Sequence, residues 1–371
     1  MSSLPQTPED ILATGIMDPE FEAAWKARGS PPGDMPAEVP TLKRLIDEGL
    51  PRLQSQLAAS RPANITETEH TLPLATGFTA RLLICHTTHT QADGDSDPKP
   101  SPIILLFHGG IHVLGHPEFD LPLARRLALA HDATVVCASP ARKAPEHPFP
   151  AMLHDAWATL QAVAHDAATT TPPTTRSFLP ARADARRAGF LVGGTSSGAN
   201  FADVVAHLAR DAGLSPPLTG SVLVCGGFMD GAEQVPPAYA GMYLSREQNR
   251  DAPVVNAGFL KAFREAVRPE VGSALWAPFV QGHPEGVAAG HRGMPPVYFQ
   301  VCGMDGNRDD GLVYERVLRE ECGVPTRVDL YRGLPHCWWD MYPDLEVSKK
   351  RLEDMIAGVG WLLGQEKGLE G

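Results

Sequence analysis

The chain has 371 residues, of which 43% are hydrophobic and 20% are charged. This length and apolar content suffice for a large buried core, so we expect a folded protein of enzyme size. Aspartate and glutamate (44) exceed lysine and arginine (32), and the resulting formal charge of −12 disfavours binding to nucleic acid or to anionic membranes.

No stretch approaches the roughly 20 apolar residues that a membrane span needs, and the opening "MSSLPQTPEDILATG" contains no apolar leader segment. We therefore expect a soluble, cytoplasmic protein with no membrane span. The six cysteines lack C-x-x-C spacing, and Cys137, Cys225 and Cys302 lie within apolar runs. Reduced thiols buried in the core are the expected state.

The amino-terminal segment, 1–66, carries helical patterns such as "PEFEAAWKARG" and "PTLKRLIDEGLPRLQSQLAAS" before any strand signal. Helices that lie outside the main alternation of strands and helices are candidates for a cap over an active site. We therefore predict N-terminal cap helices at 1–66.

Six runs rich in β-branched and apolar residues follow, and each ends in turn residues. They are "IILLFHGG" from Ile103, "ATVVCASP" from Ala133, "GFLVGGTS" from Gly189, "SVLVCGGF" from Ser221, "PVYFQVCGMD" from Pro296 and "TRVDLYRGLPH" from Thr326. Continuous apolar runs indicate strands buried on both faces, as in a parallel sheet covered by helices. Amphipathic segments separate them, so the predicted fold class is α/β.

A long span, 229–294, separates two of these strands and contains the helical pattern "NAGFLKAFREAV". We predict that it is a cap insertion, so that the core has a first part at 67–228 and a second part at 295–371. Further along, the helical pattern "GLVYERVLREECG" ends at a glycine, and Asp309 or Asp310 is placed to cap its start.

Two adjacent serines occur in "GGTSSGANF". The G-x-S-x-G motif places a nucleophilic serine on a sharp strand-to-helix turn, where glycines two residues before and after it leave room for the folded backbone. Gly194 and Gly198 meet this requirement for Ser196, whereas Ser197 has no glycine at those positions. Ser196 is therefore the candidate nucleophile, although five-residue matches of this kind also arise by chance.

The stretch "FHGGIHVLGH" follows a strand pattern and offers consecutive backbone N–H groups that a substrate oxyanion can approach because Gly109 and Gly110 lack side chains. A simple glycine turn would fit this stretch nearly as well. The chain order decides between them, because an acid, Asp305, ends a later strand beyond the serine and a histidine, His336, ends the strand after that. A core histidine packed against tryptophans is the alternative for His336.

At these residues the sequence resembles the hormone-sensitive-lipase-like family of α/β-hydrolases, which are carboxylesterases with a helical cap. The family's H-G-G-G corresponds to "HGGI", its G-D-S-A-G to "GTSSG", and its Y-R-L-A-P-E-x-x-F-P-A to "ARKAPEHPFPA". Its acid and histidine loops correspond to "DGNRD" and "GLPHCW". The resemblance covers about Phe107 to Trp338. The H-G-G-I variant and the Thr/Pro-rich insertion near residues 168 to 189 look like those of fungal members.

The resemblance implies Ser196 as nucleophile, His336 as general base and Asp305 as the acid that orients the base. The implied oxyanion hole consists of backbone N–H groups of Gly109, Gly110, Ile111 and Ser197. The resemblance also implies an α/β-hydrolase fold whose mostly parallel central sheet is covered by helices, with a helical cap from the N-terminus and an insertion.

The chain departs from the family pattern at Ile111, which replaces the third glycine and adds a branched side chain beside the acyl site. Gly306 and Asn307 replace Pro and Leu after the acid. These departures bear on substrate size more than on the reaction, and we expect small acyl groups. Candidate substrate contacts are four aromatic residues, Phe259, Phe263, Trp338 and Trp339.

No metal or other cofactor is expected. The acidic loop "DGNRDDGLVYER" fails as a calcium loop, because Asp310 stands where glycine is needed and Arg316 where a glutamate is needed. His112 and His116 are spaced as a helical metal pair, but Gly115 between them disfavours a helix.

Three functions are compatible with these residues. The leading one is a serine hydrolase that cleaves a short-chain ester or a lactone, including esters of natural products, through an acyl-enzyme. A cyclase or lyase that uses the triad histidine as a base is the alternative. A small-molecule binding protein on the same fold is disfavoured by the presence of His336. The expected partner is a small-molecule substrate, and a homodimer is compatible with the sequence.

Overall fold

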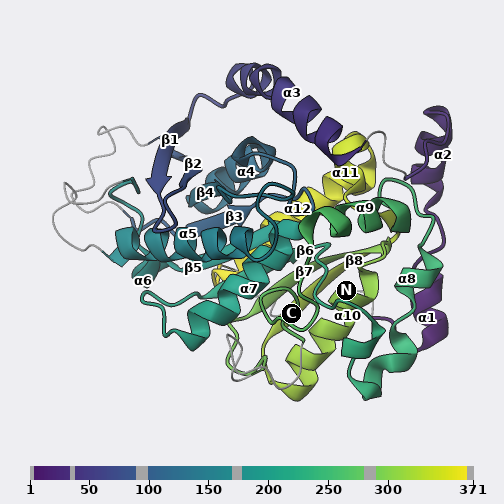
Figure 1. Cartoon of the computed structure of the whole chain (residues 1–371). Helices are drawn as coiled ribbons and strands as arrows, with labels where there is room; N and C mark the ends of the chain where they lie inside the picture. The colour runs from purple at the N-terminus through teal and green to yellow at the C-terminus, as the bar shows by residue number, and fades with distance from the viewer. Residues whose placement is uncertain (1–3, 34–37, 89–98, 169–177, 280–289, 366–371) are drawn as a thin grey trace, which may run out of the picture.

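A computed structural model of the chain describes residues 4–33, 38–88, 99–168, 178–279 and 290–365. Its centre is an eight-stranded sheet with the order β1-β2-β4-β3-β5-β6-β7-β8 (Figure 1). The strands are β1 (Ile65–Pro73), β2 (Thr79–Thr87), β3 (Ile103–Phe107), β4 (Thr134–Ser139), β5 (Phe190–Thr195), β6 (Gly220–Val224), β7 (Val297–Met304) and β8 (Thr326–Pro335). β2 pairs antiparallel with both β1 and β4, and the other neighbours are parallel. The predicted α/β class with a mostly parallel sheet is confirmed.

The helices of the described residues are α1 (Pro8–Ala13), α2 (Pro19–Ala27), α3 (Val39–Ala59), α4 (Leu121–His131), α5 (Ala151–Ala168), α6 (Ala185–Ala188), α7 (Ser197–Asp211), α8 (Ser245–Gln248), α9 (Ala257–Val267), α10 (Arg308–Arg316), α11 (Trp338–Met341) and α12 (Glu346–Leu362). α4 and α12 pack on one face of the sheet, and α5, α7 and α10 pack on the other. The sheet is therefore the middle of three layers.

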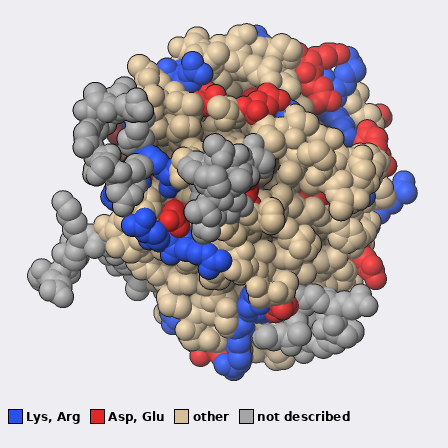
Figure 2. All heavy atoms as spheres, turned by 90° about the vertical axis from the view of Figure 1, so that its left-hand side faces the viewer, with Lys and Arg blue, Asp and Glu red and all other residues tan. Residues whose placement is uncertain are grey.

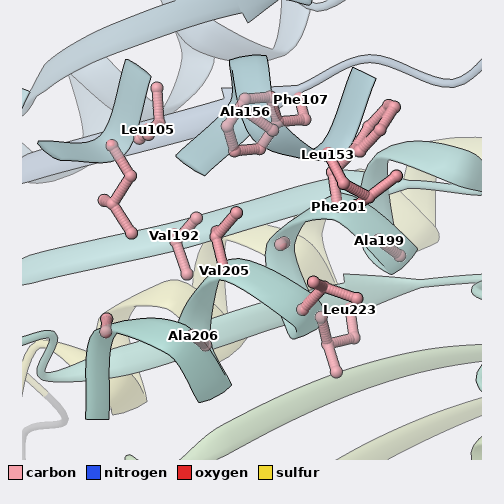
Figure 3. Packing of buried hydrophobic residues seen from close by; sticks show 14 of the residues in the cluster. Leu105, Phe107, Leu153, Ala156, Val192, Ala199, Phe201, Val205, Ala206 and Leu223 are labelled. Atoms are coloured by element: carbon pink, nitrogen blue, oxygen red, sulfur yellow. The ribbon is translucent and has the colours of Figure 1, made fainter. Parts of the chain in front are cut away.

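The sheet is buried on both faces because successive apolar residues of its strands point in opposite directions. In β3, Leu105 and Phe107 belong to the cluster under α5 and α7, whereas Ile104 and Leu106 belong to the cluster under α4 and α12. Figure 3 shows the first cluster, in which Phe201 of α7 lies near the β3 side chains. Because both faces of the sheet are buried, the strand sequences are continuous apolar runs rather than alternating ones.

Helices from two distant parts of the chain come together on one side of the core. α3 contacts α9, which lies in the long connection between β6 and β7 (Figure 1). This is the arrangement in which a cap would form, and the predicted division into cap and core segments stays a prediction.

The connection between β6 and β7 is held by buried acids. Asp309 Oδ2 accepts hydrogen bonds from the N–H groups of Leu244 and Ser245, both at 2.6 Å. Asp310 Oδ1 accepts from the N–H groups of Phe228 and Met229 at 3.0 and 2.9 Å.

The predicted capping of α10 by Asp309 or Asp310 is wrong. The residue at the N-cap is Asn307, which makes no side-chain capping hydrogen bond. Both acids lie in the first turn of the helix, and their carboxylates bind backbone donors of the β6 to β7 connection instead.

Acidic and basic side chains are both present on the face shown in Figure 2, so the negative net charge does not gather there in one patch. None of the described helices is long and apolar enough to cross a lipid bilayer.

Candidate active site

Ser196 lies at the turn between β5 and α7, at the carboxyl edge of the parallel strands. Its backbone has φ 58° and ψ −120°, a conformation that residues with a side chain rarely adopt. The Ser196 N–H donates to the Val224 carbonyl oxygen at 2.7 Å and so ties the turn to β6. A Cβ on Gly194 would lie 2.3 Å from the Gly198 carbonyl, and one on Gly198 would lie 1.9 Å from the Phe107 oxygen. The close approach of β3 and the turn therefore requires both glycines of the motif.

His336 follows β8 and Asp305 follows β7, so both side chains reach the same edge of the sheet as Ser196. His336 Nε2 lies 2.9 Å from Ser196 Oγ, and His336 Nδ1 lies 2.7 Å from Asp305 Oδ2. The other carboxylate oxygen of Asp305 accepts a hydrogen bond from the Asn307 N–H at 2.9 Å. The structure thus brings the three predicted triad residues into one hydrogen-bonded chain, and their catalytic roles stay a prediction.

The charge of Asp305 determines the protonation of His336. Burial by itself lowers the pKa of the imidazole, but the charge and hydrogen bond of Asp305 outweigh burial and raise this pKa to about 9. Only the neutral ring can accept a proton as a general base. The fraction of His336 competent for this role therefore increases with pH up to about this pKa.

The loop after β3 carries three of the four predicted oxyanion donors, and Ser197 at the start of α7 is the fourth. A Cβ on Gly109 would lie 3.4 Å from the Cβ of Ser196, which shows how closely the loop approaches the nucleophile turn. Gly110 has φ 129°, and a Cβ there would lie 2.3 Å from a backbone oxygen of the same loop. None of the loop and turn hydrogen bonds of the described residues uses the N–H of Gly110, Ile111 or Ser197 as a donor. These N–H groups are available to a substrate oxyanion.

His108 holds this loop in place through both ring nitrogens, a role that its place in the motif does not indicate. Its Nδ1 lies 2.6 Å from the Gly109 carbonyl oxygen and its Nε2 lies 2.8 Å from Ser139 Oγ. Burial lowers the pKa of His108 to about 3, so the ring is neutral at working pH. Ile111 follows with φ 53°, which is strained for a β-branched residue.

Two cavities meet at Ser196, and Ile111 and Val255 line both of them. One, which we name the cap cavity, has a volume of about 330 Å³. Its walls include His112, Asn200, Met229, Leu260 and Trp276. The other, which we name the histidine cavity, has a volume of about 630 Å³. Its walls include Asp120, Leu123, Phe259, His336, Trp339 and Leu352.

The four predicted aromatic contacts divide into two groups. Phe259 and Trp339 line the histidine cavity. Phe263 and Trp338 are fully buried and line neither cavity, so direct substrate contact is not expected of them. Phe263 packs on Phe259 with ring centres 4.9 Å apart, and Trp338 packs on Trp339 at 4.8 Å. The two buried rings therefore support the two that reach the cavity.

A second histidine of the loop, His112, is disfavoured as a metal ligand by the sequence, and a loop-lining or solvated role is expected instead. Its Nε2 lies 3.1 Å from Asn200 Oδ1, and the Asn200 amide donates to the Trp276 carbonyl at 2.9 Å. These contacts join the oxyanion loop, α7 and the β6 to β7 connection. No local pattern reveals them, because the partners are far apart in the sequence.

Buried thiols lie next to the triad. Cys225 Sγ lies 3.0 Å from Cys302 Sγ. Among the described residues, two groups of side chains are close enough to share a metal ion, and both contain Cys225. They are Cys225 with His336 and Cys337, and Cys225 with Cys302 and Asp305. Each group includes a triad side chain that is already bonded to another triad member, so we assign no metal to either.

Comparison with known proteins identifies the family. A family model described as alpha/beta hydrolase fold matches residues 104–340. The chain belongs to the hormone-sensitive-lipase-like family of α/β-hydrolases. The fold and the family inferred from the sequence motifs are therefore confirmed.

Relatives and solved structures extend this result. The AB hydrolase superfamily protein B1A11.02 of Schizosaccharomyces pombe is 37% identical over 179 residues, which are 48% of this chain and only 50% of that protein. The versiconal hemiacetal acetate esterase of Dothistroma septosporum is 27% identical over 72% of this chain and 76% of that enzyme. The crystal structure of vibralactone cyclase superimposes with a TM-score of 0.78 and 25% identity, over 96% of this chain and 97% of that chain.

Proposed function

We propose that this protein hydrolyses small carboxylic esters through an acyl-enzyme formed on Ser196. The observation that carries the proposal is the hydrogen-bonded chain from Ser196 through His336 to Asp305, placed beside unused backbone donors. The family and its esterase relatives support the same reaction class.

In this mechanism Ser196 Oγ attacks the ester carbonyl carbon while His336 Nε2 accepts the hydroxyl proton. The oxyanion that forms binds the N–H groups of Gly110, Ile111 and Ser197. The intermediate collapses when the bond to the leaving alcohol breaks and His336 donates its proton to the alcohol oxygen. Water then attacks the acyl-enzyme in the same way and releases the acid.

The proton transfer to the leaving alcohol determines which part of the ester each cavity holds. The leaving oxygen must lie within hydrogen-bond reach of His336 Nε2, so the alcohol occupies the histidine cavity, which His336 lines. The acyl chain then points the other way, into the smaller cap cavity. Ile111 stands at the boundary, where its side chain limits the acyl group. A compact acyl group such as acetyl follows from this arrangement, in agreement with the acetate esterase among the relatives.

Cyclisation is the second candidate, because the likeness to a cyclase extends over nearly the whole chain. In such a reaction His336 would act as a base and the product would be a ring rather than a free acid. The two candidates share the site and differ in the fate of the substrate.

A fluorophosphonate probe and a panel of nitrophenyl esters test the proposal. We expect the probe to add its phosphonyl group to Ser196, as a mass increase of the intact protein that is lost in Ser196→Ala and kept in Ser197→Ala. Turnover of short-chain esters should accompany labelling. Labelling without turnover of any ester would favour cyclisation, and a protein that neither labels nor turns over esters would contradict both.

A further inference from the structure

The wall of the histidine cavity contains a carboxyl group without a partner, that of Asp120. This residue precedes α4, is only 8% exposed, and does not cap the helix with its side chain. Its Oδ2 is sealed from solvent and has no hydrogen-bond partner, so Oδ1 is the oxygen that a ligand in the cavity reaches. In the described part of the chain, no side-chain hydrogen bond or ion pair of Asp120 is present.

Among the described residues, the other buried acids each accept at least one hydrogen bond, including Asp203, whose Oδ1 accepts from Tyr314 although its Oδ2 has no partner. Asp155 binds Arg142, and Asp309 binds Arg308. Leaving a buried carboxyl group unpaired costs free energy, so such groups are rare in folded proteins and are concentrated at functional sites. Burial and the nearby charge of Asp340 raise the pKa of Asp120 to about 7, and Arg351 lowers it in part.

Asp120 borders the cavity that the reacting atoms face. It lines the histidine cavity together with Ser196 and His336, and it shares a second, much smaller void with Thr195, the residue before the nucleophile. The charged residues that line the same cavity are of both signs, namely Asp340, Arg126, Lys349 and Arg351. The cavity therefore has no strong preference for a cation, and a neutral hydrogen-bond donor is the partner that fits the free carboxyl group.

We propose that Asp120 accepts a hydrogen bond from a second hydroxyl group on the leaving alcohol, so that esters of diols and polyols are preferred over esters of simple alkanols. The inference rests on the proposed esterase function and adds the class of alcohol. The apolar part of the alcohol contacts the walls formed by Leu123, Trp339 and Leu352. Asp120 thus determines specificity for the alcohol part of the ester.

The test compares 2-hydroxyethyl acetate with propyl acetate, which differ only by a hydroxyl group in place of a methyl group. We measure kcat/KM for both esters in the wild type, Asp120→Leu, Asp120→Asn and a control, Asp344→Asn, whose side chain is exposed and lines neither cavity. The wild type should prefer the hydroxyethyl ester by about 10- to 100-fold, the range for a hydrogen bond to a charged group. The preference should fall at least tenfold in Asp120→Leu, fall less in Asp120→Asn, and stay unchanged in the control.

Thermal unfolding separates this role from a structural one. Replacing an unpaired buried carboxyl group by an apolar side chain of similar shape should leave Tm unchanged or raise it. A lower Tm with an unchanged ester preference would mean that Asp120 serves the fold, and it would overturn the inference. If Asp120→Leu does not fold, the wild-type ratio decides, because a ratio near one in an active enzyme also overturns the inference. Failure of the proposed function looks different, since neither ester would react and the probe would not label Ser196.

Discussion

Replacing Ile111 by glycine should widen the range of acyl groups that the enzyme accepts. The Ile111 side chain lies next to the oxyanion donors and lines the cap cavity, which has only about 330 Å³. In the wild type we expect acetyl esters to react faster than octanoyl esters by roughly 5- to 150-fold, or about 1–3 kcal/mol, the range for a pocket that mismatches its substrate in size. The glycine variant should recover most of this difference for octanoate and little for acetate.

The fold should tolerate this change. Loss of the partly buried isoleucine removes about 1–2 kcal/mol of hydrophobic stabilisation, and glycine costs a further 0.5–1 kcal/mol, roughly, in chain entropy. Relief of the strained φ of 53° at Ile111 returns about 1–2 kcal/mol. The net change in the free energy of unfolding is therefore about 1 kcal/mol, too small to unfold the enzyme.

The assay measures kcat/KM for nitrophenyl acetate and nitrophenyl octanoate in the wild type, Ile111→Gly and Ile111→Val. The valine variant is the matched control, because it keeps the branched side chain and the strain and removes one methylene group. It should shift the acyl preference only slightly. A wild type that already prefers octanoate, or a glycine variant with no gain on octanoate, would refute the role of Ile111 and direct attention to the cap helices.

Further predictions concern the triad and its surroundings. Ser196→Ala should lower kcat by about 10⁶-fold, whereas Ser197→Ala keeps its backbone donor and should lose far less, so equal losses would contradict the assignment of the nucleophile. The kcat/KM should rise about tenfold per pH unit below pH 9 and level off above it, because His336 has a pKa of about 9 and must be neutral to act as a base. A flat pH profile between about pH 6 and 9 would exclude this role of His336. Asp305→Asn should abolish most activity with little change in Tm and shift the midpoint of the residual activity to lower pH. Asp309→Asn should instead destabilise the fold by about 3–5 kcal/mol, because it removes the negative charge that pairs with buried Arg308 and accepts from two backbone N–H groups. A melting curve like that of the wild type would refute this expectation. Activity should survive EDTA, and a loss that zinc restores would reveal a metal site.

Most of the central sheet could be predicted from the sequence, and the reason is burial. Each of the six apolar runs forms a strand within one or two residues of its expected start, because strands covered on both faces tolerate few polar residues. β1 and β2 were missed. The sequence of β1, "ITETEHTLP", has six successive polar residues along an antiparallel edge, and only Ile65 and Leu72 are buried. It lacks the continuous apolar run that identified the others, whereas β2 carries only the short run Leu82 to Cys85.

The positions of the triad residues were predictable for a related reason. Each of them follows a parallel strand, and parallel strands end at one edge of the sheet, so strand assignment alone places Ser196, Asp305 and His336 close together. No comparable rule places the four aromatic residues that were predicted to contact the substrate. Phe263 and Trp338 carry the same apolar signal as a pocket residue, but that signal is also typical of the core, where the structure places them.

What the sequence could not provide is the position of the β6 to β7 connection at this edge. Its anchors are contacts between residues 64 to 82 apart in the chain, such as the bonds of Asp309 to Ser245 and of Asp310 to Phe228. Both acids lie in the first turn of α10, which begins shortly after Asp305, so they fix the β6 to β7 connection relative to the edge of the sheet that carries Ser196 and His336. The cap cavity is bounded by Ile111 on the core side and by Leu260 on this connection. The walls of the cap cavity are therefore set by long-range contacts that no motif marks, whereas Ser196, Asp305 and His336 each stand in a recognisable local motif, although Ser196 and His336 are 140 residues apart. This is why the sequence indicates an ester hydrolase more clearly than its substrate.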